Sequence, residues 1–219
     1  MVSPSSACPF CNIASAYPPV APSAFLNLPH PTSTAPSPLL PSNPDTQAHL
    51  ILSTQHVLAF LDIMPLTKGH ILVVPREHHE KLADVGVRIS REIGQWLPVI
   101  SRVAMRTLFG EEAASESGSS SRWNWNVVQN NGVSAAQLVP HVHFHVIPRP
   151  ATNAPPSGGK VSFVMFGRGQ RDELDDEEGE ALARLLREDL AREVQRVMRE
   201  EGVDLNGQDG EDGKVLGKL

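Results

Sequence analysis

The segment His141-Val-His-Phe-His-Val-Ile-Pro148 carries three histidines at alternate positions of an otherwise apolar run. Because successive side chains of a β-strand point to opposite faces, we expect the histidines on one face and the apolar residues on the other, toward the core. Three adjacent imidazoles contribute little to packing, and each raises the cost of protonating its neighbours. The pattern therefore indicates a functional face on one strand of a sheet.

Two chemistries suit this row of histidines. Imidazole is a common zinc ligand, and near neutral pH it also acts as a nucleophile or as a general acid and base. Alternate residues of a strand lie about 7 Å apart, so three histidines of one strand do not readily converge on one ion without a bulge. A division of labour among the three is therefore expected, and the spacing alone does not choose between the two chemistries.

Composition places the chain among ordinary proteins built from one domain with appendages. It has 219 residues, of which 40% are hydrophobic and 20% charged, and a formal charge of −6. No apolar run approaches the roughly 18 residues of a membrane-spanning helix, and the segment before Asp45 lacks the basic residues that begin a signal peptide. We expect no membrane association and a cytoplasmic or nuclear location.

The negative charge is concentrated toward the C-terminus. Residues 172–219 hold 16 acidic and 7 basic side chains, which leaves 9 acidic and 12 basic side chains in the preceding 171 residues. A weakly basic body is compatible with a small phosphorylated ligand. The chain has no basic run with interleaved aromatic residues, so nucleic acid is not expected as the main partner.

Apolar periodicity predicts an α+β fold with an antiparallel sheet. Strand-like patterns occur over residues 49–53, 57–62, 70–75, 123–129 and 141–148. A long amphipathic helix is predicted over 89–109, where Pro98 either kinks the helix or delays its start. A second amphipathic helix is predicted over about 174–201, and its acidic beginning suits the dipole of a helix N-terminus.

Four segments are expected along the chain. Residues 1–13 form a short N-terminal knuckle that belongs to the core, and 14–48 form a loop insertion, because nine prolines and no charge lie between Pro18 and Pro44. Residues 49–150 form the core itself. Residues 151–219 form a C-terminal extension with a disordered end.

The chain has two cysteines, Cys8 and Cys11, separated by two residues. In a reducing compartment this spacing suggests a metal site or a redox pair more than a structural disulfide. One such pair supplies only half of a tetrahedral zinc site, so the other ligands would have to come from elsewhere in the chain.

Taken together, the motifs resemble the histidine triad (HIT) family of nucleotide hydrolases and transferases. The family signature alternates three histidines with apolar residues, as His141–Ile147 does, and further matches follow in the family's order at Cys8–Ile13, Leu58–Ile63, Gly69–His78 and Gln129–Gln137. The resemblance is closest to the purine nucleoside phosphoramidases and related fungal and bacterial hydrolases. It implies the α+β HIT fold, with a sheet of about five strands, one long core helix and usually a homodimer.

The resemblance implies covalent catalysis without an organic cofactor. His143 would attack the α-phosphorus of a purine nucleoside 5′-phosphoramidate or related conjugate, and water would release a nucleoside monophosphate from the nucleotidyl-histidine. His145 would assist proton transfer to the leaving group, and Asp62 would hold the ribose hydroxyls. The implied nucleotide-binding residues are Phe10, Ile13, Phe60, Asp62, Ile63, Asn130, Ala136, Gln137, Leu138, His143 and His145.

Two positions depart from the family pattern. Ala136 replaces a glycine whose backbone often approaches the phosphate, and an alanine with an ordinary φ angle could still donate its N–H there. Leu138 stands where several members carry a serine thought to help the leaving group. Leucine cannot donate a proton, so the preference for a leaving group stays open.

The resemblance also supplies the missing metal ligands. It implies a closed structural zinc site made by Cys8, Cys11, His78 and His141, which would anchor the N-terminal knuckle without touching substrate. His79 is an alternative to His78 by a slip of one residue. The other histidines are expected to have no functional role: His70 is structural, and His30, His49 and His56 lie at the surface or in loops.

Two other functions stay open at this point. Hydrolysis of diadenosine polyphosphates uses the same triad of histidines. A non-catalytic nucleotide-binding protein with a structural zinc ion would instead act through partners, which would contact the proline-rich loop and the acidic tail.

Overall fold

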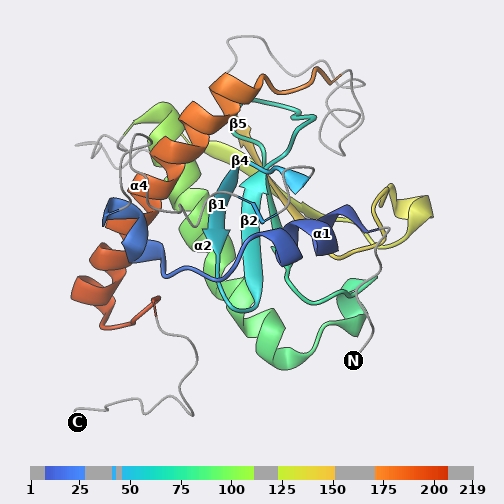
Figure 1. The fold of residues 1–219 in the computed structure, drawn as a ribbon, viewed down its shortest axis with the longest axis horizontal. Coiled ribbons are helices and arrows are strands. Elements are labelled where there is room, and N and C mark those ends of the chain that lie inside the picture. The colour runs from blue at the N-terminus through green and yellow to red at the C-terminus, as the bar shows by residue number, and fades with distance from the viewer. Residues whose placement is uncertain (1–7, 28–40, 43–45, 111–122, 151–170, 207–219) are drawn as a thin grey trace.

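A five-stranded antiparallel sheet forms the centre of the molecule (Figure 1). The computed structural model describes residues 8–27, 41–42, 46–110, 123–150 and 171–206. Within these residues the spatial order of the strands is β1-β2-β3-β5-β4. Their bounds are β1 Leu50–Ser53, β2 Val57–Leu61, β3 Ile71–Pro75, β4 Asn124–Gln129 and β5 Phe144–Arg149. The predicted α+β architecture is confirmed.

Each face of the sheet is covered by helical chain. Helix α2 (Val87–Phe109) and helix α4 (Asp176–Glu201) pack on one face, where Val57, Ala59 and Leu61 of β2 point. The short helix α1 (Pro9–Ala16) packs on the other face, against Leu58 and Phe60. The alternation of the strand side chains thus divides the core into two clusters. No helix in the described part of the chain has the length and hydropathy of a membrane span.

Two elements differ in detail from the prediction. Helix α2 runs through Pro98 without a break. The last strand, β5, begins at Phe144 and not at His141, because the backbone before it makes other contacts: the N–H of Val142 donates to the carbonyl of His79 at 2.7 Å. The first two triad histidines therefore lie on an irregular segment that leads into the strand.

Helix α4 is a layer of the core and not a separate tail. Its apolar stripe joins the same buried cluster as α2 and the sheet, through Leu182, Ala183, Leu186, Leu190, Val194 and Val197. Its N-cap, Asp175, accepts from the N–H groups of Glu177 and Glu178 at 3.0 Å, which confirms the acidic helix start.

The beginning of α4 also covers His49, which was expected at the surface or in a loop. His49 is only 4% exposed. Its Nε2 lies 3.6 Å from the carboxylate of Asp176, and its ring lies so close to Gly179 that a Cβ at this glycine would clash with it. His49 thus lies in the loop before β1, one of the two alternatives expected, and it is buried there because a helix from far along the chain covers it.

Only part of the insertion and of the C-terminal extension can be compared with the prediction. Within the proline-rich segment, Pro22–Asn27 forms a 3₁₀ turn that packs against α4. Residues 28–40 and 43–45 of that segment and the end of the chain that was predicted to be disordered lie outside the described residues.

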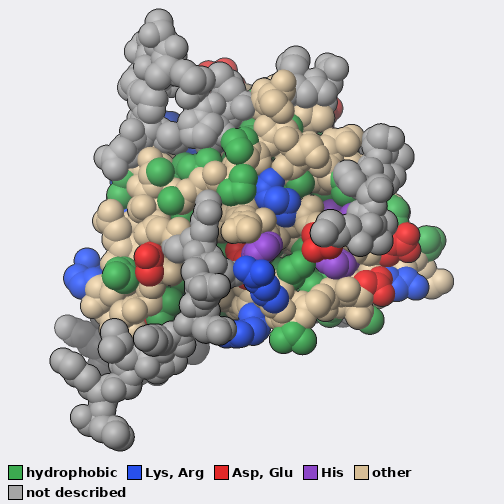
Figure 2. Space-filling view, turned by 60° about the horizontal axis from the view of Figure 1, so that its bottom comes forward, with side chains coloured by type: hydrophobic (Ala, Val, Ile, Leu, Met, Phe, Trp, Pro, Cys, Tyr) green, Lys and Arg blue, Asp and Glu red, His purple; other side chains and the backbone are tan. Residues whose placement is uncertain are grey.

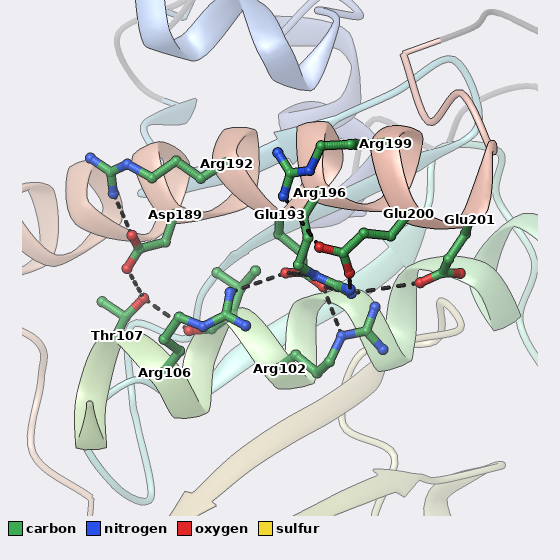
Figure 3. A network of polar contacts seen from close by, with 11 residues as sticks. Arg102, Arg106, Thr107, Asp189, Arg192, Glu193, Arg196, Arg199, Glu200 and Glu201 are labelled. Carbon is green, nitrogen blue, oxygen red and sulfur yellow. Dashed lines mark hydrogen bonds and ion pairs between the residues drawn. The ribbon is translucent and has the colours of Figure 1, made fainter. Parts of the chain in front are cut away.

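A buried carboxylate joins the two long helices (Figure 3). Glu193 of α4 is fully buried and accepts from Arg102 and Arg106 of α2 and from Arg196 of its own helix, at 2.8–3.0 Å. Burial by itself would raise the pKa of Glu193, but the three guanidinium groups outweigh it and lower the pKa to about 2.

We expect Glu193→Gln to lower the free energy of unfolding by about 2 kcal/mol or more, because three cations would lose their shared carboxylate. Urea unfolding at pH 7 measures this. The control is Glu188→Gln, on an exposed part of the same helix with arginines at 3.5 Å, which should cost less than about 0.5 kcal/mol.

The difference between wild type and Glu193→Gln should also depend on pH. A carboxyl with a lowered folded-state pKa stabilises the fold above its unfolded value of 4.5, and this stabilisation is lost as the pH falls toward about 2. The two unfolding curves should therefore converge in this range. A difference that is the same at pH 7 and at pH 3 would contradict the assignment.

Candidate active site and metal cluster

A cavity of about 680 Å³ opens beside the triad segment. Its walls come from α1, from the end of β2, from the loop between β4 and β5, and from Arg171 ahead of α4. Most of its lining is apolar. Figure 2 shows histidine side chains near the middle of one face of the molecule, with basic side chains beside them.

Ten of the eleven residues predicted to bind nucleotide line this cavity. They are Phe10, Ile13, Phe60, Asp62, Ile63, Asn130, Ala136, Leu138, His143 and His145. The exception is Gln137, which is buried: its Oε1 accepts from the N–H of Gly132 at 2.5 Å, and its Nε2 donates to the carbonyl of Glu80 at 2.7 Å. Gln137 thus ties the loop to the protein and does not face the cavity.

The backbone at Ala136 is not the ordinary one that was expected. Its φ is +65°, in the left-handed region that suits glycine, and a side chain there costs about 1 kcal/mol. Its N–H donates to the carbonyl of Val133 at 2.9 Å. The expectation that this N–H is available to a phosphate is therefore corrected: the tight turn uses it.

The middle histidine of the triad presents one free ring nitrogen. Nδ1 of His143 lies 2.7 Å from the carbonyl oxygen of His141, and because a carbonyl can only accept, Nδ1 must carry the proton. Nε2 then keeps its lone pair. Burial lowers the pKa of His143, against the opposing effects of this hydrogen bond and of Asp62, so the ring is neutral at pH 7 and can act as a nucleophile.

The third triad histidine is fixed by a chain of hydrogen bonds. The N–H of Leu66 donates to Nδ1 of His70 at 3.2 Å, so the proton of His70 resides on Nε2. Nε2 of His70 lies 2.9 Å from Nδ1 of His145 and donates to it. His145 therefore carries its own proton on Nε2, and burial lowers its pKa to about 3, so its ring is neutral as well.

His70 was expected to be structural only. It is fully buried, as that expectation implies, and yet it directly contacts a triad histidine. Burial lowers the pKa of His70 to about 2, so it stays neutral and fixes the tautomer of His145. The sequence signal was the Gly69-His70 pair ahead of β3, but the pattern did not reveal which residue the ring would touch.

Asp62 closes the other end of the cavity. Its Oδ1 accepts from the N–H of Met64 at 2.9 Å. Burial raises the pKa of Asp62, while this hydrogen bond and the nearby Arg171 act in the opposite direction. Sequence reasoning missed Arg171. No sequence pattern links this arginine to Asp62, which lies more than one hundred residues earlier in the chain.

Two cysteines and two histidines converge next to Phe10 of the cavity wall, whose ring contacts that of His141. One ligand atom from each of Cys8, Cys11, His78 and His141 lies within 4.8 Å of all the others. Cys8 Sγ is 3.4 Å and Cys11 Sγ 3.7 Å from Nδ1 of His141, and Cys11 Sγ is 3.3 Å from Nδ1 of His78. Tetrahedral Zn²⁺ holds sulfur and nitrogen ligands about 3.6 Å apart, so the cluster could hold such an ion.

The orientation of His141 suits a metal ligand. Its Nε2 donates to the carbonyl of Pro75 at 2.9 Å, which leaves the lone pair of Nδ1 facing the cysteines. The alternative ligand, His79, lies outside the cluster, and its Nε2 is 3.9 Å from Glu77.

The comparisons with known proteins agree with this geometry. A HIT domain model matches residues 43–152. The chain belongs to the HIT family. It is 43% identical over 93 residues to the adenosine 5′-monophosphoramidase of Schizosaccharomyces pombe. The aligned segment covers 42% of this chain and only 58% of that protein.

Two further HIT relatives cover more of the chain. An uncharacterized HIT-like protein of Methanocaldococcus jannaschii is 34% identical over 134 residues, which is 61% of this chain and 88% of that protein. The crystal structure of a hypothetical histidine triad nucleotide-binding protein from Sulfolobus tokodaii superposes with a TM-score of 0.53 at 19% identity, over 84% of this chain and 97% of that one. The second likeness shows the HIT fold.

Proposed function

We propose that this HIT-family nucleotide hydrolase cleaves a purine nucleoside 5′-phosphoramidate, or a related conjugate, at its α-phosphate. The observation that carries the proposal is the hydrogen bond from His143 Nδ1 to the carbonyl of His141, which leaves Nε2 as a neutral nucleophile in a residue that lines the cavity. The likeness to the fission yeast adenosine 5′-monophosphoramidase supports the choice of substrate.

The reaction would proceed in two steps. Nε2 of His143 attacks the α-phosphorus, forming an N–P bond as the bond from phosphorus to the leaving nitrogen breaks, and the departing amine takes the proton from Nε2 of His145. This leaves His145 as an imidazolate next to the positively charged nucleotidyl-His143. Water then attacks the nucleotidyl-histidine, giving one proton to His145 and releasing a nucleoside monophosphate together with neutral His143. The hydrogen bond from His70 keeps the transferable proton on the correct nitrogen of His145.

His145 would have to supply this proton without help from a hydroxyl. Leu138, at the position of the family serine, lines the cavity and is 90% exposed. An amine leaving group needs a proton more than a nucleotide leaving group of low basicity does. Phosphoramidates and diadenosine polyphosphates should therefore differ in how strongly they depend on His145.

We expect His143→Ala to reduce the release of AMP from adenosine phosphoramidate by roughly 10³-fold or more, because the nucleophile is lost. Release is measured by chromatography, in parallel with diadenosine polyphosphates, to rank the substrates. His56→Ala is the control for the loss of a histidine outside the cavity. If the wild type binds AMP but releases none from any substrate, the binding-protein hypothesis replaces the hydrolase.

We further propose that Cys8, Cys11, His78 and His141 hold a structural zinc ion. The set offers four ligands and no open position, so the metal would anchor α1 to the sheet and supply no chemistry to the reaction. Its effect on the site would be indirect, because α1 carries Phe10 and Ile13 of the cavity wall.

Neighbouring histidines allow a matched test of this metal site. We expect purified wild type and His79→Asn to contain about one zinc ion per chain, and His78→Asn to contain far less, because only the ring of His78 reaches the cluster. Metal content is measured by mass spectrometry after dialysis. Equal zinc in both variants would rule out this ligand set.

We also propose a homodimer that joins the β4 edges of two sheets. Strand β4 lies at the end of the sheet order, and its Trp125 and Val127 are 41% and 46% exposed on one face. An edge strand with large exposed apolar side chains favours a partner.

We expect Val127→Lys to shift the sedimentation mass toward the monomer, because a charge would be buried at the interface. Val203→Lys, at a similarly exposed valine beyond α4, should leave the mass unchanged. A monomeric wild type would contradict the proposal.

A further inference from the structure

The chain that leads into α4 forms part of the cavity wall. Leu174 packs against the main core and its N–H donates to the carbonyl of Ile63 at 2.8 Å. Residues 171–174 are thereby held next to the turn that follows β2. This contact brings Arg171 to the cavity, with its side chain 23% exposed.

Arg171 lies directly on the carboxylate that closes the cavity. Its Nη1 donates to the backbone carbonyl of Met64 at 3.0 Å and lies 3.5 Å from Oδ2 of Asp62. The guanidinium therefore bridges the carboxylate and the turn that orients it. Asp62 itself is 8% exposed, so its contacts with protein decide its state.

Oδ2 of Asp62 needs a cation at this place. It lies 3.3 Å from Nδ1 of His70, and this nitrogen already accepts from the N–H of Leu66, so it has no proton to offer the carboxylate. A carboxylate oxygen that faces a lone pair is electrostatically unfavourable unless positive charge lies nearby. Among the described residues, Arg171 is the arginine or lysine whose side chain forms an ion pair with this oxygen.

We propose that Arg171 is a positioning residue of the nucleotide site, which keeps Asp62 ionised and oriented so that it can accept hydrogen bonds from the ribose hydroxyls. This inference rests on the proposed function, because the cavity has to take a ribonucleotide. The C-terminal segment would thereby give the site a preference for ribose over sugars that lack both hydroxyls.

The electrostatic surroundings of Asp62 support this role. The other titratable groups that face it are the imidazoles of His70, His143 and His145, and burial keeps all three neutral. Burial raises the pKa of Asp62 and Arg171 lowers it. Without the guanidinium, the carboxyl would take up a proton at higher pH, and a protonated carboxyl accepts hydrogen bonds from hydroxyls less well.

The test compares two ligands on the full-length protein by calorimetry. AMP carries both ribose hydroxyls, whereas 2′,3′-dideoxyadenosine monophosphate carries neither. We expect Arg171→Gln to weaken AMP binding by about tenfold and binding of the dideoxy analogue by less than about twofold. Arg184→Gln, the same change at a 60% exposed arginine of α4, is the matched control and should alter neither.

A pH series separates positioning from a merely structural role. AMP affinity should fall as the pH is lowered through the pKa of Asp62, and in Arg171→Gln this fall should begin at a higher pH than in wild type, because the guanidinium lowers that pKa. Arg171→Lys keeps the positive charge and should restore most of the wild-type profile. Because the phosphate of AMP titrates equally in all these proteins, the difference between profiles reports on the protein.

The outcomes distinguish this inference from the function on which it rests. Equal losses for AMP and the dideoxy analogue, or unchanged pH profiles, would overturn the role of Arg171 while leaving the hydrolase intact. A wild type that binds neither ligand and hydrolyses no substrate would overturn both. We expect Arg171→Gln to lose affinity for AMP selectively and to shift the pH profile of AMP binding, and we expect Arg171→Lys to restore that profile.

Discussion

The position of His141 connects the cysteine and histidine cluster to the proposed catalytic histidines. Its backbone carbonyl accepts the Nδ1 proton of His143, its Nε2 donates to the carbonyl of Pro75, and its Nδ1 faces two cysteines. All three contacts depend on one backbone conformation, in the irregular segment before β5. Burial forces each polar atom to find a partner, because an unpaired group there costs 1–3 kcal/mol in typical cases. The tautomer of His143, the proposed nucleophile, therefore follows from the backbone conformation at His141.

The cavity is built from parts of the chain that lie far apart in sequence. Helix α1 supplies one apolar wall, the turn after β2 supplies Asp62, and the segment before α4 supplies Arg171. Helix α4 in turn is held to α2 by the buried carboxylate of Glu193 and its arginines. The position of Arg171 at the site thus depends on the packing of a helix that takes no part in the chemistry.

The loop between β4 and β5 is where this chain departs from the family pattern. Ala136 adopts a left-handed backbone in spite of its side chain, which indicates that the turn is imposed by its surroundings. Gln137 provides part of that constraint, because its side chain bonds to the backbone of Gly132 inside the loop and to that of Glu80 outside it. Leu138 is left exposed at the cavity, where it can contact a leaving group but cannot protonate it.

The sequence by itself determined which residues could form the fold and most of the site. Periods of two and of about 3.6 predicted the strands and both long helices to within a few residues, because burying one face of an element is a local property. The alternation of the triad predicted the burial of Val142 and Val146, although His141 and His143 are buried as well. The family resemblance supplied the proposed roles and the four candidate metal ligands that the structure brings together.

Only the tertiary structure decided the contacts that give those residues their chemistry. No local pattern specifies that the N–H of Leu66 fixes the tautomers of two histidines, that Gln137 turns away from the cavity, or that Arg171 reaches Asp62. These contacts depend on where turns and helix packing carry the chain, and burial then determines which polar atoms must pair. Sequence periodicity determines which face of each helix or strand is buried. The path of the chain between these elements determines which side chains meet, which nitrogen of a histidine carries the proton, and which charges are paired.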